Sequence, residues 1–168
     1  MIVSIRVDDR LIHGQVALVW SKEFGISRIV VANDEASKNE IQQMTLKMAT
    51  PTGIKLLIKP VKESIELFNS PKAKDVALFV LTNCIADTLA IVKACTDIKS
   101  VNVANVGRFD NSEPDKKLKL NSNIFLNERE LGALQELVEQ PVPVYHQIIP
   151  SASQTSIKSL LEGAKKKK

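Results

Sequence analysis

Short apolar segments rich in β-branched residues alternate with helical stripes, and this alternation limits the fold more than any other feature of the sequence. Apolar residues recur at helical spacing between the segments, so that strand and helix repeat at intervals of roughly 25 residues. Such alternation is typical of an α/β fold, with an open, mainly parallel sheet of about seven strands and helices on both faces. The expected strands are residues 2–7, 28–32, 54–58, 76–81, 101–104, 123–126 and 142–149.

Helix ends are marked by turn-forming and capping residues. The first helix is expected to end at Gly25, because glycine readily adopts the left-handed conformation that closes a helix. Ser37 and Glu40 form a capping box, and Asn127 with Glu130 forms a second one ahead of a later helix. The helix after the first box has one apolar stripe, made of Ile41, Met44, Thr45 and Met48.

Length and composition fit one globular domain. The chain has 168 residues, and we expect residues 1–164 to form a single domain, with residues 165–168 as a disordered lysine tail. These four lysines account for the net charge of +4, so the folded body is nearly neutral and a nucleic-acid partner is not expected. Two cysteines, no signal-like start and no run of about 18 apolar residues predict a cytoplasmic protein.

The most informative stretch is RVDDRLIHGQV at residues 6–16. It joins the first strand to the first helix, and it holds Arg6, Asp8, Asp9 and Arg10 besides one histidine. In open α/β sheets, ligands bind outside the carboxyl ends of the strands, where the strand order reverses. We therefore expect an active-site loop here, at the topological switch point.

His13 in this stretch has the surroundings that a phosphohistidine needs. An ordinary imidazole is largely neutral at pH 7 and can act as a nucleophile. One of the two aspartates could accept a ring proton, and one of the two arginines could bind phosphoryl oxygens together with amides of the helix start. Gly14 would let a phosphate approach the main chain closely. From the residues alone, a single histidine near a helix start is more often a cap or packing residue, and the charged residues could form surface ion pairs of little energetic value.

The same stretch resembles the active-site signature of IIB components of the mannose/fructose/sorbose family of the sugar phosphotransferase system (PTS). The likeness continues in VVANDE at residues 30–35 and in KMATPTGIK at residues 47–55. It extends to NVANVG at residues 102–107 and QIIP at residues 147–150, and so covers nearly the whole chain. One departure is Ala104, where the family often has glycine.

The resemblance implies a function and a set of partners. His13 would accept a phosphoryl group through Nδ1 from a phosphohistidine of a IIA domain on a separate chain. It would then pass the group to a sugar held by the membrane components IIC and IID. Arg10 would hold the phosphoryl oxygens, Asp8 would orient the ring or its loop, and no cofactor is implied. The remaining expected phosphate-binding residues are Arg6, Gly14, Gln15 and Asn83.

Other readings of the sequence stay open. Asp8, Asp9 and Asp34 could instead make a nucleotide- or metal-binding module. Cys84 follows the fourth strand and could carry the phosphoryl group on sulfur, although a small buried residue is the simpler interpretation. The identity of the sugar, a homo-oligomeric state and a weak contact of the lysine tail with a membrane surface are not decided by the sequence.

Overall fold

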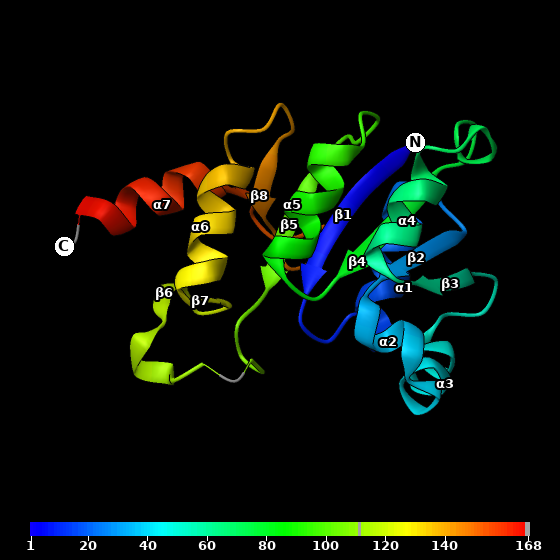
Figure 1. Cartoon of the computed structure of the whole chain (residues 1–168), viewed down its shortest axis with the longest axis horizontal. Helices are drawn as coiled ribbons and strands as arrows, with labels where there is room; N and C mark the ends of the chain where they lie inside the picture. The colour runs from blue at the N-terminus through cyan, green and yellow to red at the C-terminus, as the bar shows by residue number, and fades with distance from the viewer. Residues whose placement is uncertain (111, 167–168) are drawn as a thin grey trace.

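A seven-stranded sheet runs through the computed structural model, which describes residues 1–110 and 112–166 (Figure 1). Its strand order is β3-β2-β4-β1-β5-β8-β9, and every pair is parallel except β8 with β9. This confirms the expected open, mainly parallel α/β sheet. The strands are β1 (Ile2–Asp8), β2 (Arg28–Ala32), β3 (Lys55–Lys59), β4 (Leu78–Thr82), β5 (Val101–Asn105), β8 (Val144–His146) and β9 (Thr155–Ser156); β6 (Leu118–Asn121) and β7 (Ile124–Leu126) form a separate ribbon.

Two strand predictions were wrong in part. The segment predicted at 123–126 forms β7, but it pairs antiparallel with β6 outside the main sheet. The segment predicted at 142–149 continues as a strand only to the end of β8, because the next residue is bound by a side chain: the Gln147 amide donates to Oδ1 of Asn102. The seventh strand of the sheet is β9, which the apolar pattern did not predict.

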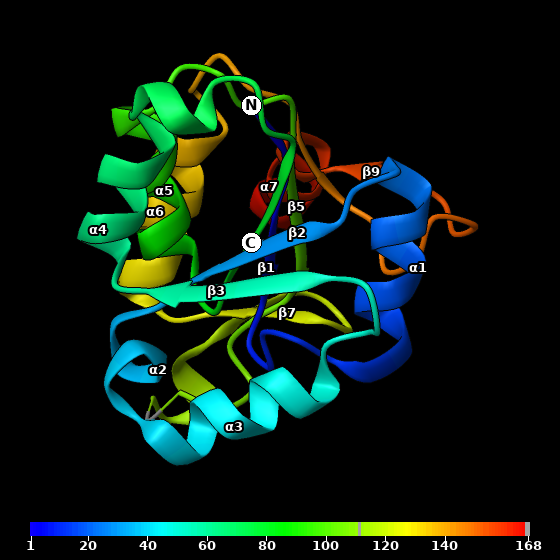
Figure 2. The same ribbon diagram turned by 90° about the vertical axis from the view of Figure 1, so that its right-hand side faces the viewer.

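Helices connect the strands and cover both faces of the sheet. In Figure 2, α1 lies on one side of the sheet, and α4, α5 and α6 lie on the other. The helices are α1 (Gly14–Phe24), α2 (Asp34–Lys38), α3 (Glu40–Ala49), α4 (Val61–Phe68), α5 (Ile85–Ala94), α6 (Glu128–Leu137) and α7 (Ile157–Lys166), with 3-10 turns η1 (Pro71–Ala73) and η2 (Pro114–Lys116).

The sheet separates two apolar cores. Along β4, Leu78 and Val80 enter the core shared with α4, α5, α6 and α7, whereas Phe79 and Leu81 enter the core shared with α1 and α3. This alternation follows from the two-residue period of a strand. It explains why β4 reads as a continuous apolar run, since both of its faces are covered.

Capping explains where several helices begin and end. Gly25 ends α1 in the left-handed conformation as predicted, and Asn127 caps α6 by accepting the Glu130 amide at 2.8 Å. The capping box predicted at Ser37 was wrong: Ser37 lies within α2, and Asn39 caps α3 by accepting the amide of Gln42.

The first half of the predicted disordered lysine tail is helical in the structure. Lys165 and Lys166 complete the last turn of α7 and are not a disordered extension. Lys167 and Lys168 lie outside the described residues, and the boundary proposed at residue 164 stays a prediction. Within residues 1–110 and 112–166, no helix is both long and apolar enough to cross a membrane.

The direction of the strand connections changes at β1. The chain leaves β1 toward α1 on one face, whereas its neighbours β4 and β5 lead to α5 and α6 on the other face. Loops therefore diverge on either side of β1, which is the geometry of a topological switch point. The loop predicted to hold the site lies there.

Candidate functional site

The loop between β1 and α1 is held in a fixed, partly left-handed conformation. Leu11 has a φ of 59°, which is unusual for a residue with a Cβ, and Gly14 has a φ of 40°. Leu11 and Ile12 are buried in the core beneath α1 and α3, and this packing compensates for the strained backbone. Leu11 and Ile12 therefore fix the loop to the core, while polar residues of the loop lie at the surface.

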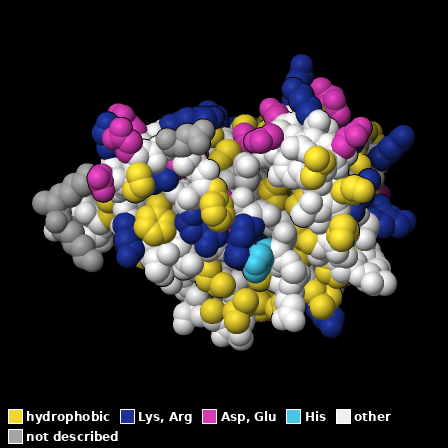
Figure 3. Space-filling view, turned by 90° about the horizontal axis from the view of Figure 1, so that it is seen from below, with side chains coloured by type: hydrophobic (Ala, Val, Ile, Leu, Met, Phe, Trp, Pro, Cys, Tyr) yellow, Lys and Arg dark blue, Asp and Glu magenta, His cyan; other side chains and the backbone are white. Residues whose placement is uncertain are grey.

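Arg10 and His13 meet at the surface of this loop. Nη1 of Arg10 lies 2.6 Å from Nε2 of His13. A guanidinium can only donate, so Nε2 accepts and the ring proton lies on Nδ1. Nδ1 is buried without a hydrogen-bond partner among the described residues. Figure 3 shows an imidazole beside basic side chains on the face seen from below.

Asp8 does not contact the imidazole but fixes its arginine neighbour. It is 1% exposed, and Oδ1 accepts the Arg10 amide at 3.0 Å and lies 3.8 Å from Arg10 Nε. Oδ2 accepts Nδ2 of Asn105 at 3.2 Å. The hypothesis that Asp8 or Asp9 accepts a proton from the ring was wrong for this conformation, because both carboxylates are bonded elsewhere. Asp8 instead contacts both the amide and the guanidinium of Arg10.

Arg6 lies beneath the site and not at its surface. Its side chain is 3% exposed, its guanidinium lies over the ring of Trp20, and Nη2 is 3.6 Å from Oδ2 of Asp8. Nη1 donates to the carbonyl of Gln147 at 3.3 Å. Burial lowers the pKa of Arg6 to about 10, against the opposing effect of the Asp8 charge. The guanidinium of Arg6 is therefore too buried to contact a phosphate at the surface. Arg6 balances the buried charge of Asp8 instead.

The loop after β5 adds an arginine that the sequence analysis did not identify. Arg108 Nη2 donates to Asp9 Oδ1 at 2.8 Å, and both the Arg108 amide and Nε donate to Oδ2 at 3.3 Å. Gly107 has a φ of 87°, and a Cβ there would collide with the carbonyl of Phe125, so this turn requires glycine. Ala104, the departure from the family pattern, is buried within β5 and needs no glycine.

The start of α1 completes the surface around His13. His13 is the N-cap residue of α1, but its side chain makes no cap hydrogen bond. Gly14 and Gln15 are exposed in the first turn, and no atom lies within 4 Å of a Cβ placed on Gly14. Free amides and the positive end of a helix favour anions, so a phosphoryl group on the ring can lie against this turn.

Asn83, the last predicted phosphate-binding residue, comes directly after the strand next to β1, because Thr82 at the end of β4 pairs with Val7. It follows β4 and lines a polar pocket together with Asp9, Cys84 and Glu130. None of the hydrogen bonds described for Arg10 or His13 involves it. Direct contacts therefore join Arg10 to His13 and to Asp8, whereas Asn83 lines a pocket together with Asp9.

The side chains of the alternative sites are bonded or buried in other ways. Asp34 accepts the amide of Val61 at 2.8 Å and so caps α4, while Asp8 and Asp9 bind arginines. No group of three metal-ligating side chains occurs in the described part of the chain. Burial raises the pKa of the Cys84 thiol to about 12, which keeps the sulfur protonated and a poor nucleophile.

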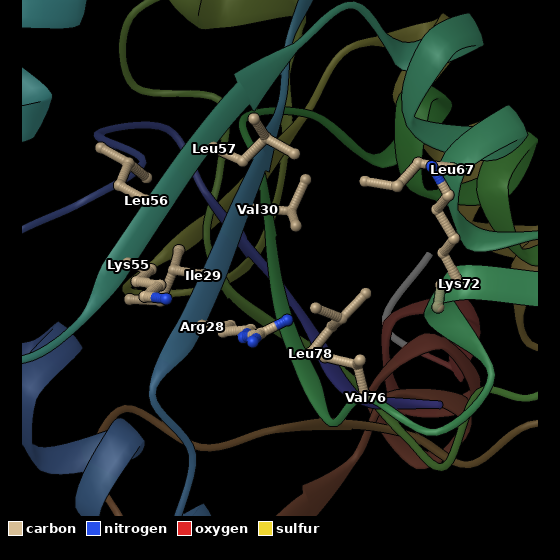
Figure 4. Close-up of a pocket in the computed structure, with 11 residues that line it drawn as sticks. Arg28, Ile29, Val30, Lys55, Leu56, Leu57, Leu67, Lys72, Val76 and Leu78 are labelled. Atoms are coloured by element: carbon tan, nitrogen blue, oxygen red, sulfur yellow. The ribbon is translucent and has the colours of Figure 1, made fainter. Parts of the chain in front are cut away.

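A second concave surface lies away from the site. Apolar side chains, including Leu57 and Leu67, line a groove between α4 and the edge of the sheet, with Arg28, Lys55 and Lys72 at its rim (Figure 4). None of the predicted site residues contributes to it.

Comparisons with known proteins show the family of this chain. A family model for the PTS system sorbose subfamily IIB component matches residues 2–168. A probable phosphotransferase enzyme IIB component of Streptococcus pyogenes serotype M6 is 53% identical over 96% of this chain and 99% of its own length. The mannose-specific EIIAB component of Escherichia coli K12 is 30% identical over 82% of this chain, which matches 41% of that longer protein.

A solved structure has the same fold. The IIBSor domain of the sorbose permease from Klebsiella pneumoniae superimposes with a TM-score of 0.87 at 27% identity, covering 97% of both chains.

Proposed function

Because this chain belongs to the sorbose subfamily of PTS IIB components, we propose that it carries a phosphoryl group on His13 from a IIA phosphohistidine to a sugar. The observation that carries the proposal is the contact between Arg10 and His13 at the start of α1. It joins a nucleophilic ring, a planar cation and free helix amides at one surface position.

Two transfers make up the proposed cycle. In the first, a nitrogen of the His13 ring attacks phosphorus, the new N–P bond forms, and the N–P bond of the donor histidine breaks. In the second, a sugar hydroxyl attacks the same phosphorus, an O–P bond forms, and the His13 ring leaves with its electron pair. The hydroxyl proton passes to a base at the acceptor site or to water. The protein has only to position the groups and to stabilise the charge on three phosphoryl oxygens.

Arg10 has a separate task in each state of this cycle. Before transfer it donates to Nε2, which leaves the ring proton on Nδ1. For transfer through Nδ1, the proton must move to Nε2 and the ring must turn so that Nδ1 reaches the donor. Arg10 is then released from Nε2, and its fork of N–H donors can bind two phosphoryl oxygens. Asp8 keeps the arginine within reach through the Arg10 amide.

The partners follow from this function. We propose a IIA domain on another polypeptide as the donor, and membrane components IIC and IID with a bound sugar as the acceptor. The name of the mannose-specific EIIAB relative supports a IIA partner, because it denotes both activities in one protein. The protein would then work in the cytoplasm, at the inner face of the membrane, through these partners.

The test is phosphorylation from phosphoenolpyruvate through the general PTS proteins and a IIA domain. The wild type should be labelled, and His13→Ala should not. His146→Ala is the matched control, because His146 donates from Nδ1 to the Val103 carbonyl within the sheet and should be labelled as the wild type is. Full labelling of the His13→Ala protein would disprove the proposal.

A further inference from the structure

Helix α3 exposes a row of large apolar side chains. Ile41 is 78% exposed, Met44 is 64% exposed and Met48 is 85% exposed. They stand three and four residues apart, so they lie on one face of the helix. Only Leu46 of α3 is buried. We call the three exposed residues the α3 stripe; the apolar face expected from the sequence therefore forms, but it faces solvent and not the core.

The α3 stripe belongs to the same edge of the molecule as the His13 loop. In Figure 2, α3 lies along the bottom of the view, and the loop from β1 to α1 runs at the same end of the molecule. Leu46 packs in the same core cluster as Leu11 and Ile12, which anchor the loop. Any protein that brings a phosphorylated histidine to His13 must approach this edge.

The edge offers both apolar and positive contacts. Phe109 lies in the loop after β5. Its side chain is 68% exposed, and the guanidinium of Arg108 lies over its ring. Arg10 and Arg108 are cations with partly exposed side chains that suit the anionic phosphoryl group of a donor. Methionine side chains adapt to different surfaces, which suits a partner that must bind and leave in each cycle.

Charge around the stripe indicates which partner covers it. Glu35 and Lys38 of α2 are exposed, as are Glu40 and Lys47 of α3, so these charges balance around the stripe. An anionic bilayer surface attracts clusters of basic residues, and this mixed set offers no such cluster. A soluble protein domain with an apolar patch beside its phosphohistidine needs no net charge here.

From these observations we infer that the α3 stripe is the docking surface for the phosphoryl-donor domain. The inference rests on the proposed function, since it assumes transfer to His13. Donor contacts on α3 lie outside the reacting groups, so they govern how often the donor binds and not how fast the phosphoryl group moves once it is bound.

The test compares a Met44→Gln/Met48→Gln double variant with the wild type. Glutamine favours helix about as well as methionine, so α3 should remain intact. We expect the KM for the phosphorylated IIA domain to rise about tenfold, the loss of one interface anchor, with kcat unchanged. Leu57→Gln is the matched control. Leu57 is also an exposed apolar residue, but it lines the groove between α4 and the edge of the sheet. The KM of this variant for the phosphorylated IIA domain should equal that of the wild type.

A small phosphoryl donor separates the two proposals. Phosphoramidate needs no docking surface, so it should label the double variant on His13 as fast as the wild type. Failure to label His13 in the wild type with either donor would remove the proposed function itself. An unchanged KM for the IIA domain would overturn the docking surface alone. If the double variant lost only the transfer of the phosphoryl group to sugar, the stripe would belong to the membrane partner and the docking proposal would be wrong. The proposal would also be wrong if sedimentation showed a dimeric wild type and a monomeric double variant.

Discussion

Nη1 of Arg10 donates to Nε2 of His13 across 2.6 Å, within the loop between β1 and α1. The left-handed conformation of Leu11 brings the two side chains together, and the Asp8 carboxylate holds the Arg10 amide at 3.0 Å. The nucleophile and its cation are thus positioned by the strand end and by a buried anchor. This relationship makes Arg10 the residue whose removal should affect the chemistry most directly after His13.

Replacing Arg10 with alanine should slow phosphorylation of His13 about 100-fold, the usual cost of removing one preorganised donor to a developing anion. The phosphorylation rate of Arg10→Lys should lie between those of the wild type and Arg10→Ala, because an ammonium keeps the charge but lacks the planar set of N–H donors. Single-turnover labelling from phosphorylated IIA measures both rates. Nitrogen chemical shifts of the free protein provide a second readout, because without Arg10 the ring should lose its preference for the Nδ1–H tautomer. Equal rates and tautomers in all three proteins would contradict this role.

Arg6 should act through stability and positioning. Arg6→Met leaves the Asp8 carboxylate buried without its inner cation, and we expect unfolding free energy to fall by about 3 kcal/mol. Adding Asp8→Asn to this variant removes the uncompensated charge and should recover part of the loss. Urea unfolding of the single and double variants measures the effect. If adding Asp8→Asn to Arg6→Met lowers the unfolding free energy as much as Asp8→Asn does in the wild type, the two side chains are not coupled.

Gly107→Ala should destabilise the protein by roughly 3 kcal/mol, because the new methyl group meets the Phe125 carbonyl and the residue must keep a positive φ. The matched control is Gly132→Ala in α6, where a Cβ meets no atom within 4 Å; this variant should gain roughly 0.5–1 kcal/mol from helix propensity. Thermal or urea unfolding of both variants distinguishes them. A Gly107→Ala protein as stable as the wild type would mean that the turn is not fixed as described.

Glu130 should make stability depend on pH. Its carboxylate accepts the amides of Ile85 and Ala86, yet burial raises its pKa above the ordinary 4.5. The folded protein therefore binds this proton more tightly than the unfolded chain. Its contribution to stability is greatest below about pH 4.5 and declines as the pH rises through the folded-state pKa.

Unfolding across a pH series tests Glu130. Glu130→Gln should lack this decline, and it should lose about 1–3 kcal/mol near pH 7 because one of the two amides loses its acceptor. Glu136→Gln on the same helix is the control: Glu136 has a 48% exposed side chain, and its replacement should stay within about 0.5 kcal/mol of the wild type. An identical pH slope in wild type and Glu130→Gln would refute the assignment.

Cys84 should be dispensable for phosphoryl transfer. Because burial raises the pKa of its thiol to about 12, the thiolate is scarce at neutral pH. Cys84→Ser should therefore be labelled at the wild-type rate, and the native thiol should react with iodoacetamide much more slowly than a free cysteine at pH 8. An acid-stable phosphoenzyme that disappears in Cys84→Ser would move the phosphoryl group from nitrogen to sulfur.

The sequence predicted the elements whose causes are local. Continuous apolar runs identified the buried strand β4, glycine chemistry identified the end of α1 at Gly25, and a capping asparagine identified the start of α6. The same local rules predicted the loop between β1 and α1 as the position of the site, because strand ends converge there in any parallel sheet.

Features that depend on distant contacts were not predictable in this way. Ser37 and Asn39 are both good caps, and only the packing of α2 decides that Asn39 is used. The strand pattern continues through Gln147, but a side chain on β5 bonds its amide. Arg108 stands nearly 100 residues from Asp9 in the chain, so no spacing pattern could pair them.

The most direct test of the central claim is to locate the phosphoryl group in the labelled wild-type protein. Phosphorylation followed by phosphorus–proton and nitrogen NMR, with peptide mass spectrometry under mildly alkaline conditions, assigns both the residue and the ring atom. We predict one phosphoryl group per chain, on His13, joined to Nδ1. A phosphoryl group found on His146, on Cys84 or on any carboxylate would contradict the account.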